Sequence, residues 1–488
     1  MQRFTRLVLL LFFTIVAVDL VGLFYSGADD STSTNFQTVT TAPPLSVDRP
    51  NSTGYFLFLG FAAAPSVDPI KAGFDMWLEA ESGYGHWFLD YSKEQRAELR
   101  FTANEVPAFD AWKEPDPIAK FTEHQEEYTA AVARYPHLIN RYAQWLSTPF
   151  DDMGYGHPGS PRAVELFVAH RLYLGQGFAL NAGEGLDRLE QDLSAWRTVL
   201  ASAKTLPVKV LAASVVDDDA HLLSALLSQP DLDRRTFQRV TTLARPLSQE
   251  ERSLRWPIQN EFAKGLARYE RTRVKQDPTA QEDAKNNQQW IASTAGMTEH
   301  EFEQVAHPVP PLAIVRGLVK KQRSLNIFAA YYDSTIKATE APGRTLPKLH
   351  DIANAVPGSF FDEFINPFDN FLYRAPEPNW KPFVDRLMET DTRLRLAALQ
   401  AVLRIASSQQ PYQAHIAKAG PNYYDPFTGL PMIWDPEEGK LYSAGKDGRD
   451  DGGEYAFDIG VQVYQPRQPS LLAPRAPRVN PAHVPRQT

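Results

Sequence analysis

The residues best suited to chemistry are five acids near the end of the chain, Asp447, Asp450, Asp451, Glu454 and Asp458. Glycines separate them, and glycine lets a backbone fold closely around a ligand. Ca²⁺ prefers about six to eight oxygen ligands, which carboxylates on such a loop can supply. The spacing differs from that of an EF-hand loop. We predict a calcium site here, and the alternative is a solvated acidic turn in which Asp side chains cap backbone amides.

A hairpin is expected to position this acidic loop. Residues 431–434 and 440–443 are two short strand-like pieces on either side of the turn sequence DPEEG at 435–439. Short apolar and aromatic runs separated by turn residues are typical of a β-hairpin. The hairpin and the loop together form a small C-terminal module.

The sequences DPFTGLP (425–431) and YSAGKDGRDDGG (442–453) carry a resemblance. Residues 380–460 resemble the C-terminal module of type II secretion major pseudopilins, and also a group of uncharacterised bacterial envelope proteins that end in the same phrase. In those pseudopilins a helix precedes the module and the acidic loop holds a structural calcium. The resemblance therefore implies a metal role for Asp447, Asp450 and Asp451. The N-terminus lacks the Gly-Phe and fifth-position Glu of a prepilin processing site, so the chain is not itself a pseudopilin.

Two further groups could bind a ligand. The sequence Gly-Tyr-Gly-His occurs at 83–86 and at 154–157, so His86 and His157 could share a metal, although a short repeat of this kind also arises by chance. The run DDD at 217–219 interrupts a helical pattern just before HLLSALL. A carboxylate cluster could bind a cation, but aspartate at a helix start also caps free amides, and we expect a cap.

Composition excludes several function classes. The chain has no cysteine, which excludes disulfides, thiolate metal sites and cysteine nucleophiles. A net charge of −9 argues against a nucleic-acid partner, because nucleic-acid binders carry clustered positive charge. The nucleophile elbow, the phosphate loop and the dinucleotide fingerprint are all missing from the sequence.

The N-terminal segment 7–25, LVLLLFFTIVAVDLVGLFY, is long enough to span a membrane. Basic residues Arg3 and Arg6 precede it and acidic residues Asp29 and Asp30 follow it. This pattern predicts that the N-terminus lies in the cytoplasm and that the rest of the chain lies outside it. We therefore expect a single-pass protein of the bacterial inner membrane with its bulk in the periplasm. The alternative is a signal peptide that is cleaved near 26–28, which also exports the chain.

Most of the exported chain has helical periodicity. Helices are expected at 69–82, 116–133, 137–147, 162–179, 185–204, 207–228, 232–244, 248–275, 311–338 and 379–408. Residues 55–61, YFLFLGF, fit either a buried strand or one end of a helix. Short links make successive helices antiparallel neighbours. The predicted fold is mainly α, an antiparallel helical array of the kind that includes α-α superhelices, with an N-terminal transmembrane helix and a small C-terminal β-hairpin.

These patterns divide the chain into five parts: an anchor (1–27), a flexible linker (28–54), a helical body (55–378), the helix with the pseudopilin-like module (379–464) and a Pro/Arg-rich disordered tail (465–488). No catalytic set is visible in the sequence. We expect a non-catalytic scaffold or assembly factor that binds another envelope protein, stabilised by Ca²⁺. The alternative is an extracytoplasmic metal-dependent hydrolase whose site assembles only in three dimensions.

Overall fold

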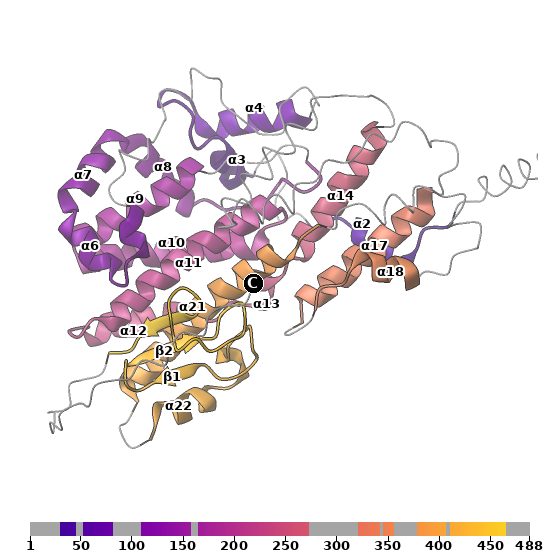
Figure 1. Cartoon of the computed structure of the whole chain (residues 1–488). Helices are drawn as coiled ribbons and strands as arrows, with labels where there is room; N and C mark the ends of the chain where they lie inside the picture. Colours follow the sequence, from indigo (N-terminus) through magenta and orange to yellow (C-terminus); the bar gives the residue numbers. More distant parts are fainter. Residues whose placement is uncertain are drawn as a thin grey trace, which may run out of the picture.

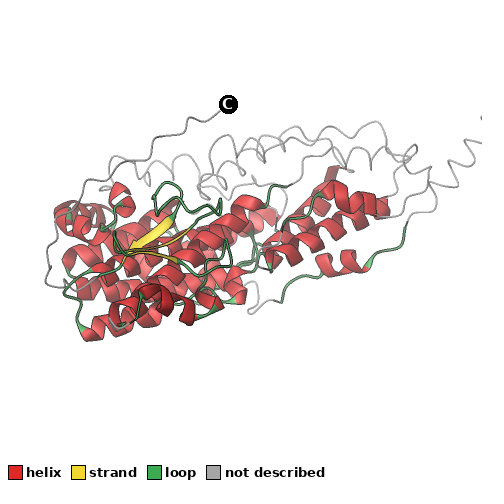
Figure 2. Ribbon diagram, turned by 60° about the horizontal axis from the view of Figure 1, so that its bottom comes forward, coloured by secondary structure: helices red, strands yellow, loops and turns green. Residues whose placement is uncertain are grey.

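The computed structural model describes residues 30–44, 52–81, 109–157, 164–272, 321–341, 345–355, 378–406 and 410–464. Over these ranges the protein is mainly α, with a small three-stranded antiparallel sheet near the C-terminus (Figure 1). Figure 2 shows the helices as an elongated body, with the strands on one face.

The α-helices in the described ranges are α2 (Thr34–Thr40), α3 (Thr53–Leu59), α4 (Pro69–Glu81), α6 (Pro117–Glu123), α7 (Gln125–Arg134), α8 (Pro136–Leu146), α9 (Val164–Leu180), α10 (Ala182–Ser202), α11 (Leu206–Ser228), α12 (Arg234–Leu243), α13 (Gln249–Arg252), α14 (Arg255–Thr272), α17 (Lys321–Thr339), α18 (Leu349–Ala355), α21 (Lys381–Ile405) and α22 (Tyr412–Ala419). Single 3₁₀ turns are η2 (Phe109–Lys113) and η3 (Pro421–Tyr423). The strands are β1 (Ile433–Asp435), β2 (Lys440–Ser443) and β3 (Ile459–Gln462).

Helices α9, α10, α11 and α21 form the centre of the body. Asn181 caps the start of helix α10 because its side chain accepts a hydrogen bond from the Glu184 amide, and α11 has Pro207 in its first turn. Helix α11 packs against α10 on one side and along α21 on another, so nearly all of its residues are buried (Figure 1). A helix that is apolar on all sides is typical of such a central position.

Residues 55–61 are helical over most of their length, because α3 packs directly on α4. A Cβ on Gly73 would lie only 1.9 Å from the Phe56 carbonyl oxygen, so the two backbones approach more closely than any other residue allows. The Phe56 ring contacts the rings of Phe74 and Trp77, with centroids 5.1 and 6.1 Å away. Packing against a neighbouring helix thus decides the conformation that periodicity left open.

The predicted hairpin is confirmed. Strands β1 and β2 pair with Asp435 opposite Lys440, and Gly439 has a φ of 65° in the turn between them. Strand β3, which the sequence did not indicate, pairs with the other edge of β2. Apolar residues of this sheet form a second small core against α21 and α22.

Helix α21 also belongs to the main core, through Leu394, Ala397, Ala398 and Ala401. Gln400 joins the two parts, because its amide nitrogen donates to the Ser224 carbonyl oxygen of α11 and to the Gln462 carbonyl oxygen of β3. The body and the C-terminal module therefore meet along one shared helix.

At the N-terminal end, helix α2 lies within residues 28–54, where a flexible linker was expected. Its Val39 is fully buried, and the helix packs against α14 and α17. The expected anchor at 7–25 and the tail 465–488 lie outside the described residues. No helix in the described ranges is both long and apolar enough to cross a membrane.

Candidate functional site

Three adjacent helices each place one titratable side chain at a common buried point. They are His170 on α9, Asp192 on α10 and Asp219 on α11, and all three residues are fully buried. One ligand atom from each lies within 4.8 Å of the others. Within the described ranges, no other group of three acidic or histidine side chains lies this close together.

Asp192 is at the centre of a short hydrogen-bonded chain. Its Oδ2 lies 3.0 Å from His170 Nδ1, and its Oδ1 accepts a hydrogen bond of 2.5 Å from the Tyr142 hydroxyl. Trp196 Nε1 donates to the same hydroxyl at 2.7 Å. Asp192 is thereby held by His170 of α9 and Tyr142 of α8, and Tyr142 is held by Trp196 of α10.

Asp219 differs from its neighbours because neither of its carboxylate oxygens accepts a hydrogen bond from a described residue. Burial raises the pKa of Asp219 well above its usual value, and the negative charges of Asp192 and Asp218 and a close approach to the Asp192 carboxyl group, which favours a shared proton, act in the same direction. An ionised carboxylate without a partner is one of the most unfavourable groups to bury. The arrangement therefore calls for a positive charge or a proton at this point.

On the other side of the imidazole, His170 Nε2 faces Asp218 Oδ2 at a distance of 3.7 Å. Arg171 holds Asp218 with two hydrogen bonds, of 2.7 Å from Nε and 3.1 Å from Nη2. Burial alone would raise the pKa of Asp218, but Arg171 and His170 hold it well below its usual range. Burial lowers the pKa of His170, but the charges of Asp192 and Asp218 outweigh this effect and raise it.

The third aspartate of the run, Asp217, forms an ion pair with Arg393 of α21 at 2.9 Å, and Arg386 lies 3.8 Å from its other oxygen. All three aspartates are inside α11, eleven or more residues after its first residue. The expected helix-start cap is therefore wrong, because the preceding residues 206–216 continue the same helix.

The acidic loop uses its carboxylates mainly to fix its own turns. Asp458 is buried, and its Oδ2 accepts hydrogen bonds from the amides of Asp451 and Gly453. Asp450 Oδ1 accepts from the Gly452 amide and from the Tyr442 hydroxyl at 2.9 Å. These contacts are the ones expected if the loop is an acidic turn whose aspartates cap backbone amides, which was the alternative to a calcium site.

Some features of the loop nevertheless suit a cation. Asp458 Oδ1 is buried and accepts no hydrogen bond from a described residue. Burial raises the pKa of Asp458, and the charges of Asp451 and Asp450 raise it further. Asp447, Asp450, Asp451 and Glu454 are exposed. The calcium site at these five residues stays a prediction.

The histidine pair expected from the repeated tetrapeptide is described only in part, because His86 lies outside the described residues. His157 is buried, its Nε2 lies 3.0 Å from the Trp77 carbonyl oxygen, and its ring stacks on the Trp77 ring at 4.9 Å. These contacts are those of a core histidine.

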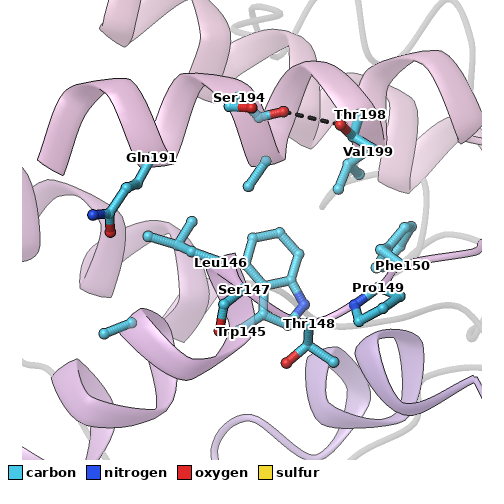
Figure 3. Close-up of a pocket in the computed structure, with 12 residues that line it drawn as sticks. Trp145, Leu146, Ser147, Thr148, Pro149, Phe150, Gln191, Ser194, Thr198 and Val199 are labelled. Carbon is cyan, nitrogen blue, oxygen red and sulfur yellow. Dashed lines mark hydrogen bonds between the residues drawn. The ribbon is translucent and has the colours of Figure 1, made fainter. Parts of the chain in front are cut away.

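A shallow cleft of about 450 Å³ lies between the end of α8, the following segment and α10. Figure 3 shows Trp145 in the middle of this cleft, with Phe150 on one side and Ser194 and Thr198 above it. The Trp145 ring, which lines the cleft, contacts the Trp196 ring at 4.7 Å, and Trp196 in turn donates to Tyr142 of the buried cluster.

Comparisons with protein-family models, with curated proteins and with solved structures found no match. The assignment of function therefore rests on the chain's own residues.

Sequence reasoning did not single out His170 or Asp192. A signal exists for Asp192, because it lies three residues after Leu189 and four before Trp196, on the buried stripe of α10 itself. An acid in that position needs a partner in the core. His170 gives a weaker signal, because a histidine in an apolar helix is compatible with many environments.

Proposed function

We propose that this protein is a membrane-anchored, extracytoplasmic scaffold or assembly factor of the bacterial envelope, which acts without catalysis by binding another envelope protein. The proposal includes an antiparallel array of helices, an N-terminal transmembrane helix at 7–25 and a bulk that lies in the periplasm. The opposite charges on the two sides of segment 7–25 support this orientation.

The observation that carries the proposal is the attachment of the C-terminal module to the helical body. Helix α21 packs along α11 with one face and against the small sheet with the other. Hydrogen bonds from Gln400 and Arg404 reach carbonyl oxygens of α11, so the attachment also has polar contacts. A module fixed in this way presents its loops at a constant place on the body, which is what a scaffold requires.

Apolar side chains are exposed on the loops that this module presents. Leu430, Tyr455 and Phe457 are 64%, 62% and 47% exposed, although most large apolar residues of the described chain are buried. Aromatic residues are enriched in protein interfaces, where one fully covered ring contributes much of the binding free energy. These three residues are the surface that we assign to the partner.

The acidic loop lies between β2 and β3 and also contains Tyr455 and Phe457. We propose that Ca²⁺ binds Asp447, Asp450, Asp451, Glu454 and Asp458 and stiffens this surface. Positive φ angles at Gly448, Gly452 and Gly453 bring the loop backbone into tight turns, so carbonyl oxygens are also available to the ion.

The partner is tested by crosslinking in intact cells and recovery of the full chain from detergent-solubilised membranes. Tyr455→Ser with Phe457→Ser should abolish a crosslinked species that the wild type forms. Leu180→Ser removes an equally exposed apolar residue, 47% exposed, from the end of α9 and should leave that species unchanged. Equal loss in both variants, or no loss in the first, would contradict the assignment.

Two further measurements test the compartment and the ion. A periplasm-dependent reporter fused after residue 60 should be active, and activity of a cytosolic reporter at that position would overturn the orientation. EGTA should lower the melting temperature of the wild type but not that of Asp450→Ala with Asp451→Ala. An unchanged wild-type melting temperature would remove the calcium site.

A further inference from the structure

The buried point between α9, α10 and α11 brings two carboxyl groups and one imidazole together without a lysine or an arginine of its own among the described residues. The arginines that approach the cluster are already paired, Arg171 with Asp218 and Arg393 with Asp217. Among the described residues, no lysine or arginine forms an ion pair with Asp192 or Asp219. Two carboxylates thus share one apolar interior position with a single imidazole.

Asp219 is the second observation that points to a ligand. It is fully buried, it approaches both Asp192 and His170, and neither of its oxygens accepts a hydrogen bond from the described chain. The side chains around it come from three buried helices, so Asp219 cannot reach solvent by a change of rotamer. A bound cation would supply the positive charge that this carboxylate lacks.

We propose that His170, Asp192 and Asp219 bind one Zn²⁺ ion that ties the three central helices together. One imidazole nitrogen and two carboxylate oxygens form a mixed nitrogen and oxygen donor set, which suits Zn²⁺ better than Ca²⁺ or Mg²⁺. A tetrahedral ion with bonds of about 2.1 Å separates its ligand atoms by about 3.4 Å. Ligand atoms within 4.8 Å of one another, and as close as 3.0 Å, need only small shifts to reach that spacing.

The neighbours of the three ligands fit the same assignment. His170 Nδ1 faces Asp192, so it is the nitrogen that meets the ion, and Nε2 then faces Asp218 at 3.7 Å. A metal-bound histidine usually has a carboxylate beyond its other nitrogen, and Arg171 holds this carboxylate in place. The Tyr142 oxygen, 3.3 Å from Nδ1, is a fourth donor atom close to the ion.

This site is distinct from the acidic loop and does not depend on the envelope role. The full chain, purified in detergent and stripped with EDTA, is titrated with Zn²⁺ and with Co²⁺. Because the point is fully buried, each ion is added both to the folded protein and during refolding from urea. Metal content after gel filtration, the melting temperature and the visible absorption of Co²⁺ are then measured.

We expect one equivalent of Zn²⁺, a higher melting temperature, and a Co²⁺ spectrum typical of four ligands including nitrogen. Asp219→Asn should weaken Zn²⁺ binding by at least about 100-fold, since changes outside the ligands already weaken it by about 10- to 100-fold. His170→Gln should behave in the same way. Asp187→Asn is the matched control, because it makes the same change on the exposed face of α10, and it should bind Zn²⁺ as the wild type does.

Circular dichroism of each variant separates a lost ligand from a lost fold. The inference is overturned if neither mode of addition gives bound metal. It is also overturned if Asp219→Asn retains the full equivalent, because the ion would then bind elsewhere. If no metal binds, a proton shared by Asp192 and Asp219 would explain how the two carboxyl groups can be buried together.

Discussion

Asp217, Asp218 and Asp219 are consecutive in the chain but have different partners, because each step along a helix turns the side chain by about 100°. Asp217 points to the arginines of α21 and Asp218 to Arg171 of α9, whereas Asp219 points into the interior between α9 and α10. A single run of three identical residues thus supplies two ion pairs and one carboxyl group that faces Asp192 and His170. The position of each side chain on the helix decides which neighbours it meets.

Tyr142 shows how strongly the buried cluster depends on one hydroxyl group. That hydroxyl donates to Asp192 and accepts from Trp196, so Tyr142→Phe leaves two buried polar atoms, Asp192 Oδ1 and Trp196 Nε1, without these hydrogen bonds. We expect a loss of about 2 to 4 kcal/mol in the free energy of unfolding, measured by urea denaturation of the metal-free chain. Tyr55→Phe is the control, since the fully buried Tyr55 hydroxyl has no described partner and its removal should cost nothing. Equal effects of the two changes would contradict the role of Tyr142.

Lys209 gives the protein a pH dependence of its own. Burial lowers the pKa of Lys209 from 10.5 to about 7, although the charge of Glu251 opposes this, and its Nζ donates to the carbonyl oxygens of Leu200 and Glu250. Between the folded and the unfolded pKa, the unfolded chain binds more protons at this residue than the folded chain. Stability therefore rises with pH between about 7 and 10.5, and the contribution of Lys209 no longer changes below about pH 7, where both states are protonated.

Lys209→Met removes this contribution. From pH 6.5 to pH 9 the free energy of unfolding of the wild type should increase by about 2 kcal/mol relative to that of Lys209→Met. Urea denaturation at the two pH values measures the difference, and all other titrating groups cancel in the comparison. A difference that does not change with pH would show that Lys209 keeps its charge in the folded protein.

At the scale of the element, the contact between α3 and α4 depends on glycine. Gly73→Ala places a Cβ 1.9 Å from the Phe56 carbonyl oxygen, so the helices must move apart. Overpacking of this kind costs about 1 to 3 kcal/mol. Gly265→Ala in α14 is the matched control: a Cβ there meets nothing within 4 Å, and the better helix propensity of alanine should stabilise the chain by about 0.5 to 1 kcal/mol. Changes of the same sign in both melting temperatures would contradict this account.

Local patterns predicted the elements well and their surroundings poorly. The expected helix at 185–204 corresponds to α10, and its stripe of Leu189, Leu193 and Trp196 is buried, because periodicity records which face meets a core. Strand β3 was not expected, since four residues with a central glycine show no alternation and acquire their role only by pairing with β2. The His170 cluster was also missed, because three helices from separate parts of the chain must meet before it exists.

At the scale of the whole molecule, α21 makes one unit of parts that the sequence suggested were separate. Leu394, Ala397 and Ala401 on one side of the helix belong to the main core, and Leu396 and Leu399 belong to the core of the module. Arg393 of the same helix also neutralises Asp217 of α11. A boundary near residue 378 would therefore cut through the packing of the helical body.

This sharing predicts the result of two truncations. A chain that ends at residue 378 lacks α21, so the apolar face of α11 and the charge of Asp217 lose their cover, and we expect no cooperative unfolding transition in urea. A chain that ends at residue 406 keeps α21 and should unfold cooperatively, because only the smaller core of the module is lost. Circular dichroism and urea denaturation compare the two. If the shorter chain also unfolds cooperatively with near-native helix content, the body folds without α21, and the module is then an independent domain whose loops are not fixed on the body.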